Sequence, residues 1–114
     1  MEMKVHLHAD VFEIVKNGKK DIEVRINDEK RRKLKVGDTL VFLKRPLDDE
    51  EIRANVVALE YYDFFEDLVN HYDMERIYLK EYTKEQYLNE MKRFYTREEQ
   101  EEYGVVAIIF DKEN

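Results

Sequence analysis

The sequence predicts an α+β fold, in which a small curled sheet of about five strands has helices packed on its outside. Three observations support this class. Short segments with alternating polar and apolar residues occupy the first half of the chain, as in half-buried strands. Segments with apolar residues at helical spacing follow, within residues 63–104. Every residue of the final segment, 105–110, is apolar, at odd and even positions alike. This pattern predicts a strand that is covered on both faces and lies inside the sheet.

The N-terminal part of the chain is predicted to form a strand, a helix and a second strand. Val5 and Leu7 alternate with polar neighbours, as a half-buried strand requires. Asp10, with Glu13 three residues later, indicates the start of a capped helix, which Gly18 would end. The second strand is expected at residues 21–26 because Ile22, Val24 and Ile26 share one face, and Asp21, Glu23 and Arg25 share the other.

The next part of the chain is predicted to contain a short basic helix and two more strands. Residues 28–34 favour a single helical turn, and residues 35–38 favour a tight turn in which Gly37 takes a positive φ. Strands are expected at residues 39–44 and 53–59. Together with the last strand, these segments complete the predicted sheet.

Three helices are predicted between the fourth strand and the last one. Asp63, Thr83 and Thr96 each precede a Glu or Gln by three residues, which is the capping-box pattern of a helix start. Gly104 is expected to end the third helix. The apolar stripes that would pack against the sheet are Phe64, Phe65, Leu68, Val69 and Tyr72 in the first helix, and Tyr87, Leu88, Met91, Phe94 and Tyr95 in the second.

The composition indicates one globular domain over residues 1–114 with an uneven distribution of charge. Apolar residues make up 43% and charged residues 41% of the chain, and the net charge is −7. This sum argues against a protein that coats nucleic acid through a basic surface. However, residues 16–35 hold nine Lys or Arg against four Asp or Glu, a local net charge of +5. This basic segment is the first indication of function.

Several classes of function are made improbable by what the sequence lacks. The chain has no Cys, which removes disulfides, thiol nucleophiles and zinc knuckles, and it has no Ser nucleophile. No apolar run approaches the roughly 18–20 residues of a membrane helix, and the N-terminus lacks the apolar core of a signal peptide. A cytoplasmic protein without membrane contact is therefore expected. His6 and His8 share a strand face but lack further ligands at metal-site spacing, so neither a metal nor a cofactor is predicted.

One motif carries a resemblance to a known family. Gly18–Arg25 has the sequence GKKDIEVR, which fits the pattern G-x-K-x-x-E-x-R, and the flanking segments Lys35–Asp38 (KVGD) and Tyr103–Ile108 (YGVVAI) follow it. Together these segments resemble the ASCH domain family, whose members are relatives of the PUA domain. The resemblance covers almost the whole chain. It implies a PUA-like β-barrel, a cleft lined by the motif residues, and an association with RNA binding or RNA modification.

The resemblance also implies roles for three motif residues. Some small bacterial members look like enzymes that hydrolyse the acyl amide of N4-acetylcytidine, with a catalytic lysine at the position of Lys20. Here Lys20 could act in that way, hold a phosphate or carbonyl oxygen, or be a solvated surface residue. Glu23 stands where those members carry a threonine nucleophile, so it could act only as a base or accept from a base-edge amine. Arg25 would contact ligand or form an internal salt bridge with Glu23. Glu75 is a positional candidate for their catalytic acid.

Further basic and aromatic residues are candidates for contacts with nucleic acid. Lys19, Arg31 and Arg32 lie in or beside the motif and could bind phosphates, although such a run of basic residues also suits a solvated helix face. Tyr61 and Tyr62 could stack on bases or simply end a strand.

Three functions are consistent with these observations. The first is binding of RNA, or of a modified or unmodified nucleoside or nucleotide, in a cleft lined by Lys20, Glu23 and Arg25. The second is a nucleoside-acting enzyme, either similar to the N4-acetylcytidine amidohydrolases or a ribonuclease, with Lys20 and Glu23 as catalytic residues. The third is a regulatory domain that binds another protein. Convergence of the three motif residues on one pocket with basic surroundings would favour the first.

Overall fold

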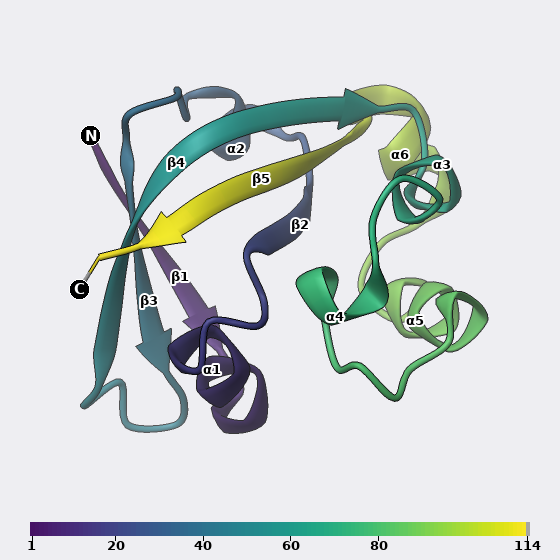
Figure 1. Cartoon of the computed structure of the whole chain (residues 1–114). Helices are drawn as coiled ribbons and strands as arrows, with labels where there is room; N and C mark the ends of the chain where they lie inside the picture. Colours follow the sequence, from purple (N-terminus) through teal and green to yellow (C-terminus); the bar gives the residue numbers. More distant parts are fainter. Residues whose placement is uncertain (114) are drawn as a thin grey trace.

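The computed structural model describes residues 1–113, and within them five strands form one sheet accompanied by six helices (Figure 1). The predicted α+β class is confirmed. The strands are β1 (Glu2–Leu7), β2 (Ile22–Ile26), β3 (Thr39–Lys44), β4 (Glu51–Tyr62) and β5 (Val105–Lys112). The helices are α1 (Ala9–Lys16), α2 (Glu29–Arg32), α3 (Phe65–Val69), α4 (Met74–Ile77), α5 (Lys84–Met91) and α6 (Arg97–Tyr103).

The sheet has the strand order β1-β3-β4-β5-β2 and curls into a half-barrel (Figure 1). Strand β4 is the cause of the curl, because its beginning pairs with β3 and its remainder pairs with β5. A register irregularity between Val56 and Ala58 lies where this change occurs, and such bulges bend a strand and increase its twist. The predicted fourth strand, 53–59, was therefore too short: β4 extends to Tyr62 and contains Tyr61.

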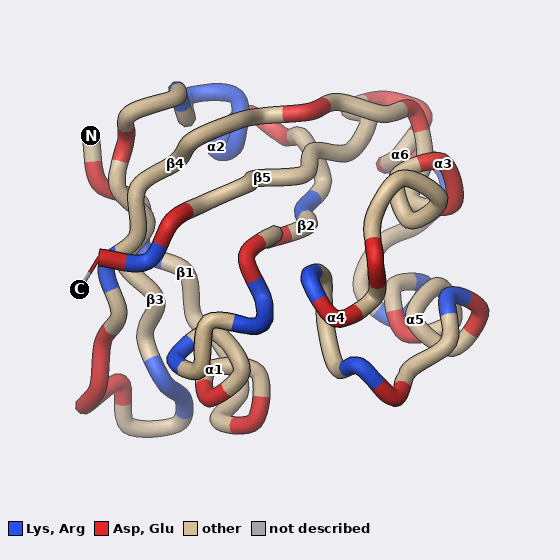
Figure 2. Tube along the Cα trace, in the orientation of Figure 1, with Lys and Arg blue, Asp and Glu red and all other residues tan. Residues whose placement is uncertain are grey.

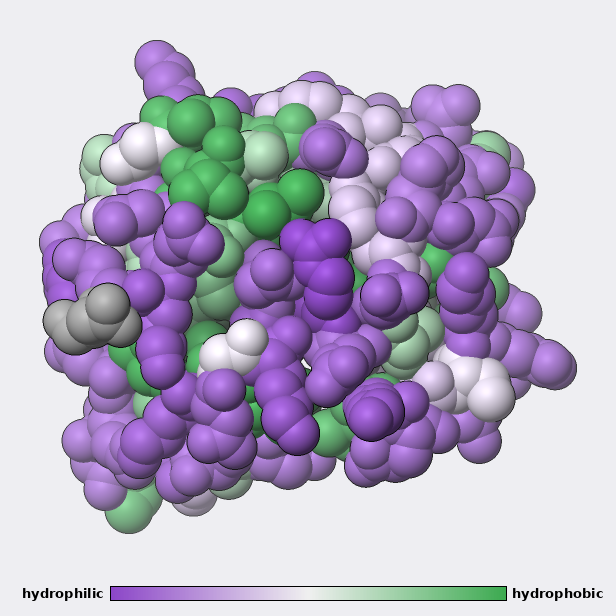
Figure 3. Space-filling view, viewed as in Figure 1, coloured by the Kyte–Doolittle hydropathy of each residue, from purple (hydrophilic) through white to green (hydrophobic). Residues whose placement is uncertain are grey.

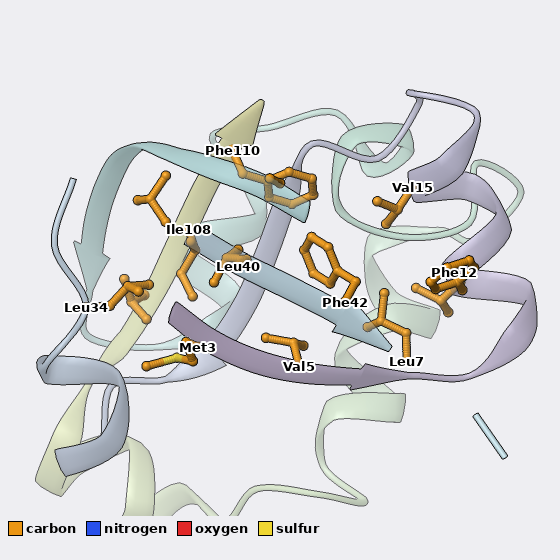
Figure 4. Close-up of a cluster of buried hydrophobic side chains, with 14 residues drawn as sticks. Met3, Val5, Leu7, Phe12, Val15, Leu34, Leu40, Phe42, Ile108 and Phe110 are labelled. Carbon is orange, nitrogen blue, oxygen red and sulfur yellow. The ribbon is translucent and has the colours of Figure 1, made fainter. Parts of the chain in front are cut away.

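One face of the curled sheet encloses the first of two apolar cores (Figure 4). Alternate residues of β1 point into this core, as their strict alternation between exposed and buried positions shows. Helix α1 closes it with Phe12 and Val15, neither of which is exposed to solvent. Phe42 of β3 packs against Phe110 of β5 with their ring centroids 4.9 Å apart. This core fixes the strands that carry the motif and its flanks.

The second core lies on the opposite face of β2 and β5 and is covered by the helices that follow β4 (Figure 1). Strand β5 contributes to both cores, with Val106 and Ile108 in the first and Val105 and Ala107 in the second. It pairs with β4 on one side and β2 on the other. The prediction that the last strand is covered on both faces and lies inside the sheet is thus confirmed.

The helix starts show which caps were predicted correctly. Thr83 and Thr96 each form a complete capping box, as the sequence indicated. The other two predicted caps are wrong. Helix α1 follows His8, and the Asp10 carboxylate instead accepts a hydrogen bond from the next backbone N–H at 2.9 Å. Helix α3 begins after Phe64 rather than after Asp63.

The start of α3 depends on a residue distant in sequence. The backbone N–H of Phe65 donates to Oε1 of Gln100, a buried residue of α6, over 3.1 Å. A side chain of one helix therefore satisfies the free N–H of another. The short helix α4 was not predicted, because its four residues carry no apolar stripe of their own.

Charge is distributed unevenly over the surface (Figure 2). Basic residues concentrate on α2, whereas acidic residues predominate on α6. The face shown in Figure 3 is mostly hydrophilic, with an apolar patch near its upper edge. Among residues 1–113, no helix has the length and apolarity needed to cross a bilayer.

Gly104, between α6 and β5, is expected to be sensitive to substitution. Its φ is 71° and its ψ is −174°, a region that residues with a Cβ rarely adopt. A Cβ at this position would also lie 3.1 Å from the backbone oxygen of Tyr62. Gly104→Ala should therefore lower the free energy of unfolding by about 1–3 kcal/mol, measured by urea denaturation. Gly18→Ala is the control, since φ is also positive there but a Cβ would meet nothing within 4 Å; equal costs at the two positions would contradict the expected clash.

Candidate functional site

A pocket of about 580 Å³ lies between the motif strand and the helical segment around α4 and α5. One wall comes from the end of β1, from α1 and from β2, and the other comes from residues 77–95. The charged and aromatic residues that line it are His6, His8, Lys20, Glu23, Arg25, Glu90, Arg93, Tyr78, Tyr87, Phe94 and Tyr95. The three central residues of the motif therefore converge on one pocket.

Lys20 lies at the base of this pocket and is only 3% exposed. Its Nζ donates to the backbone oxygen of Ile77 in α4 at 2.7 Å and to the backbone oxygen of Ile22 in β2. It also forms an ion pair with Glu23 Oε1 at 3.1 Å. An ammonium group has three N–H donors, so each of them has a partner within the chain. Lys20 thus joins β2 to α4 and positions Glu23.

Glu23 is likewise 3% exposed and lies between two cations. Its Oε2 is 2.8 Å from Nη2 of Arg25, but no N–H of that guanidinium is directed at it. Among the described residues, this buried oxygen consequently has no hydrogen-bond donor. Burial alone would raise the pKa of Glu23, yet the charges of Arg25 and Lys20 outweigh it and lower the pKa. Glu23 is therefore a carboxylate whose Oε2 is ion-paired with Arg25 but accepts no hydrogen bond from the described residues.

Arg25 forms the part of the site nearest the aromatic wall. Its Nη1 donates to the backbone oxygen of Val24 at 3.3 Å. Burial opposes its charge, but Glu23 and the nearby Tyr95 and Tyr87 raise the pKa of the guanidinium. The predicted internal salt bridge between Glu23 and Arg25 is present, and the side chain of Arg25 remains partly exposed in the pocket.

The other predicted basic residues separate into two groups. Burial lowers the pKa of the Arg31 guanidinium in α2, and the positive charge of Arg25 lowers it further. Arg32 turns to the end of α6, where it donates to the backbone oxygens of Asn27 at 2.8 Å and Tyr103 at 3.3 Å. Lys19 is exposed, and neither it nor Arg32 lines the pocket. Arg31 does not line the pocket either, but its charge acts on both Glu23 and Arg25, which distinguishes it from the other two.

The opposite wall of the pocket was not recognised from the sequence. Tyr87 was assigned to an apolar stripe, and it is buried, but it also lines the pocket. Phe94 was wrongly assigned to the core: it is 60% exposed at the pocket, because α5 ends at Met91 and helical spacing no longer applies beyond it. The acidic residue of this wall is Glu90 rather than Glu75, which does not line the pocket.

A second hollow, of about 740 Å³, has the opposite charge character. It lies at the junction of β4, α3 and α6 and has no Lys or Arg among its lining residues. Its acidic lining residues are Asp63, Asp67, Glu101 and Glu102. Tyr61 and Tyr62, considered above as stacking residues, line this hollow and not the motif pocket. Within residues 1–113, no three His, Asp or Glu side chains are grouped to hold a metal ion.

The curled sheet with outer helices and a pocket beside its edge strand is the architecture expected of a PUA-like domain. Comparison with protein families agrees, since residues 5–114 match the ASCH domain. The chain belongs to the ASCH domain family, and the resemblance drawn from the motif is confirmed. No curated protein matches it.

Solved structures support the same assignment. The hypothetical protein PH0355 is 30% identical, with a TM-score of 0.85 over 99% of this chain and 100% of its own. Protein PF0455 from Pyrococcus furiosus is 31% identical, with a TM-score of 0.76 over 98% of this chain and 97% of its own. A mutant of the ZmASCH protein from Zymomonas mobilis is 16% identical, with a TM-score of 0.61 over 96% of this chain and 67% of its own, and shares the fold.

Proposed function

We propose that this protein binds RNA, or a nucleoside or nucleotide, by holding one base in the pocket formed by Lys20, Glu23 and Arg25. The observation that carries the proposal is Oε2 of Glu23, a buried carboxylate oxygen that is ion-paired with Arg25 but has no hydrogen-bond donor among residues 1–113. Leaving a buried charged acceptor unsatisfied costs stability, so a ligand that donates to it gains binding energy. The site therefore requires a ligand that has an N–H or O–H donor.

The neighbouring groups narrow the chemistry of that ligand. Glu23 is an acceptor and Arg25 is a donor, and they lie side by side with Oε2 2.8 Å from Nη2. A nucleobase edge presents the complementary arrangement, in which an amine or ring N–H adjoins a carbonyl or ring nitrogen. A polar pair of this kind also suits an amide, but the aromatic wall favours a flat ring.

Phe94 supplies an exposed aromatic face at the pocket, and Tyr78 and Tyr95 line the same wall. Stacking on aromatic side chains contributes about 1–3 kcal/mol per base in proteins that bind single strands. The pocket volume of about 580 Å³ falls within the range of roughly 300–1,000 Å³ for small-molecule sites. A single base with its sugar, and not a stacked duplex, fits this description.

Catalysis by the family's threonine mechanism lacks support here. Thr83 and Thr96 cap helices, and Thr39 begins β3, so none of the three threonines lines the pocket. Burial lowers the pKa of Lys20, against the opposing charge of Glu23, but its Nζ is already held by the backbone oxygens of Ile22 and Ile77 and by Glu23. Binding therefore accounts for the geometry better than amide hydrolysis does.

The proposal predicts that Glu23→Gln weakens binding. Wild-type protein should bind the four ribonucleosides, their 5′-monophosphates or single-stranded RNA in calorimetric titrations at low salt. Because the variant replaces a carboxylate with a neutral amide, affinity should fall by about tenfold or more. Glu102→Gln makes the same change in the acidic hollow and is the matched control.

Phe94→Ala provides a second variant, because an exposed side chain can be removed without disturbing the fold. It should weaken binding through lost stacking. The proposal is overturned if the wild type binds none of these ligands, or if Glu23→Gln and Phe94→Ala both bind as Glu102→Gln does.

A further inference from the structure

We propose that Arg31 and Arg25 together form a phosphate subsite beside the base pocket, so that the ligand is a phosphorylated nucleotide unit and not a free nucleoside. This inference rests on the proposed function for the base. The phosphate subsite rests on separate observations, however, and its binding can be tested apart from that of the base.

The first observation concerns the side chain of Arg31. Helix α2 follows β2 after two residues. Arg31 is partly buried, and its Nε is a buried donor with no acceptor among the described residues. Asp28, the N-cap of α2, accepts instead from the backbone N–H of Arg31 at 3.1 Å. A buried guanidinium nitrogen without an acceptor is costly, and a phosphate oxygen would satisfy it.

The second observation is the balance of charge around this nitrogen. Three cations, Lys20, Arg25 and Arg31, share two nearby carboxylates, Glu23 and Asp28. Glu23 already forms ion pairs with both Lys20 and Arg25, at 3.1 and 2.8 Å. The two guanidiniums are close enough for their repulsion, after burial, to lower the pKa of Arg31. An anion between them would offset that repulsion.

The arginine side chain also points to phosphate as the anion. A guanidinium presents a planar fork of donors that matches the oxygens of phosphate, and two such forks can hold one phosphoryl group. Arg25 lines the base pocket, which Arg31 does not, and the charge of Arg25 acts on Arg31, so Arg25 would connect the two subsites. A base held beside Glu23 would thus place its attached phosphate toward α2.

Other basic residues of α2 do not share these properties. Arg32 donates to two backbone oxygens and lies 5.6 Å from the centre of the Tyr103 ring. Lys30 and Lys33 are exposed, and a solvated lysine needs no further partner. Of the basic residues of α2, Arg31 alone is therefore assigned to the phosphate, together with Arg25 of β2.

The test compares nucleosides, their 5′-monophosphates and inorganic phosphate in calorimetric titrations at low salt. The wild type should bind a monophosphate about tenfold or more tightly than its nucleoside. Arg31→Gln should remove most of this difference, whereas the nucleoside affinity should change less. Lys30→Gln removes one charge from the same helix and should retain the difference. Circular dichroism checks that both variants fold.

The outcomes separate this inference from the proposed function. If nucleosides bind but the phosphate adds nothing, or if Arg31→Gln and Lys30→Gln behave alike, the phosphate subsite is overturned and the base site stands. If inorganic phosphate binds and Arg31→Gln removes that binding while no nucleoside binds, the phosphate subsite stands and the base site is overturned. Absence of binding to all three probes overturns both.

Discussion

Replacing Glu23 by leucine is expected to lower the free energy of unfolding by about 3–5 kcal/mol, because it leaves a buried cation without its counter-charge. Glu23 and Lys20 are each 3% exposed, so water cannot replace the lost carboxylate at Lys20 Nζ. Lys20 also retains its bonds to the backbone oxygens of Ile22 and Ile77, which prevent it from turning to solvent. Chemical denaturation followed by circular dichroism measures the effect.

Two further variants isolate the ion pair itself. In a double-mutant cycle, Lys20→Met with Glu23→Leu should cost less than the sum of the two single changes, since no unpaired charge remains at positions 20 and 23 and the loss of the Arg25 partner is common to both variants of Glu23. Glu50→Leu is the control, because Glu50 pairs with Lys16 at 3.0 Å on the exposed surface and its loss should have a far smaller effect. Additive costs at positions 20 and 23, or equal effects of Glu23→Leu and Glu50→Leu, would contradict this account.

The second large effect is expected in the first apolar core, where Phe42→Ala should cost about 3–5 kcal/mol. Phe42 is 0% exposed and packs between β1, α1 and β5 (Figure 4). Truncation removes its contact with Phe110 and leaves a cavity that the surrounding strands cannot close. The change should appear as a lower denaturation midpoint with an unchanged dependence on denaturant.

Phe94→Ala makes the same chemical change at an exposed position. With 60% of its surface in solvent, Phe94 should contribute little to stability, whereas the same variant is expected to weaken base binding. A stability loss at Phe94 comparable to that at Phe42 would place this ring in the core, contrary to the structure.

The features predicted correctly are those that neighbouring residues determine. The capping boxes at Thr83 and Thr96 form within four residues of sequence, so their pattern was sufficient. Strand β5 was identified as internal because every residue from 105 to 110 is apolar, whichever face it takes. The start of α3 was missed because its cap, Gln100, comes from another helix 35 residues away.

The candidate site likewise combines features that residue spacing predicts with features that only the packing of distant segments decides. The period of two along a strand placed Glu23 and Arg25 on one face, and their ion pair follows from that spacing. The difference between Arg31 and Arg32 does not follow from spacing, since adjacent residues of one short helix meet different neighbours. Phe94 does not continue the apolar stripe of α5, because that helix ends three residues earlier, at Met91.

The sequence by itself determined the α+β class, the ASCH family and the strand that carries the motif, because local periodicity and a contiguous motif depend only on nearby residues. Only the tertiary structure decided that Lys20 is buried and bound to the backbone of α4, that Oε2 of Glu23 has no hydrogen-bond donor among residues 1–113, and that the Nε of Arg31 has no acceptor there. The physical reason is that desolvation and hydrogen-bond satisfaction depend on which distant segments pack together. Here Ile77 of α4 must dock on β2 before Lys20 is buried and the pocket exists.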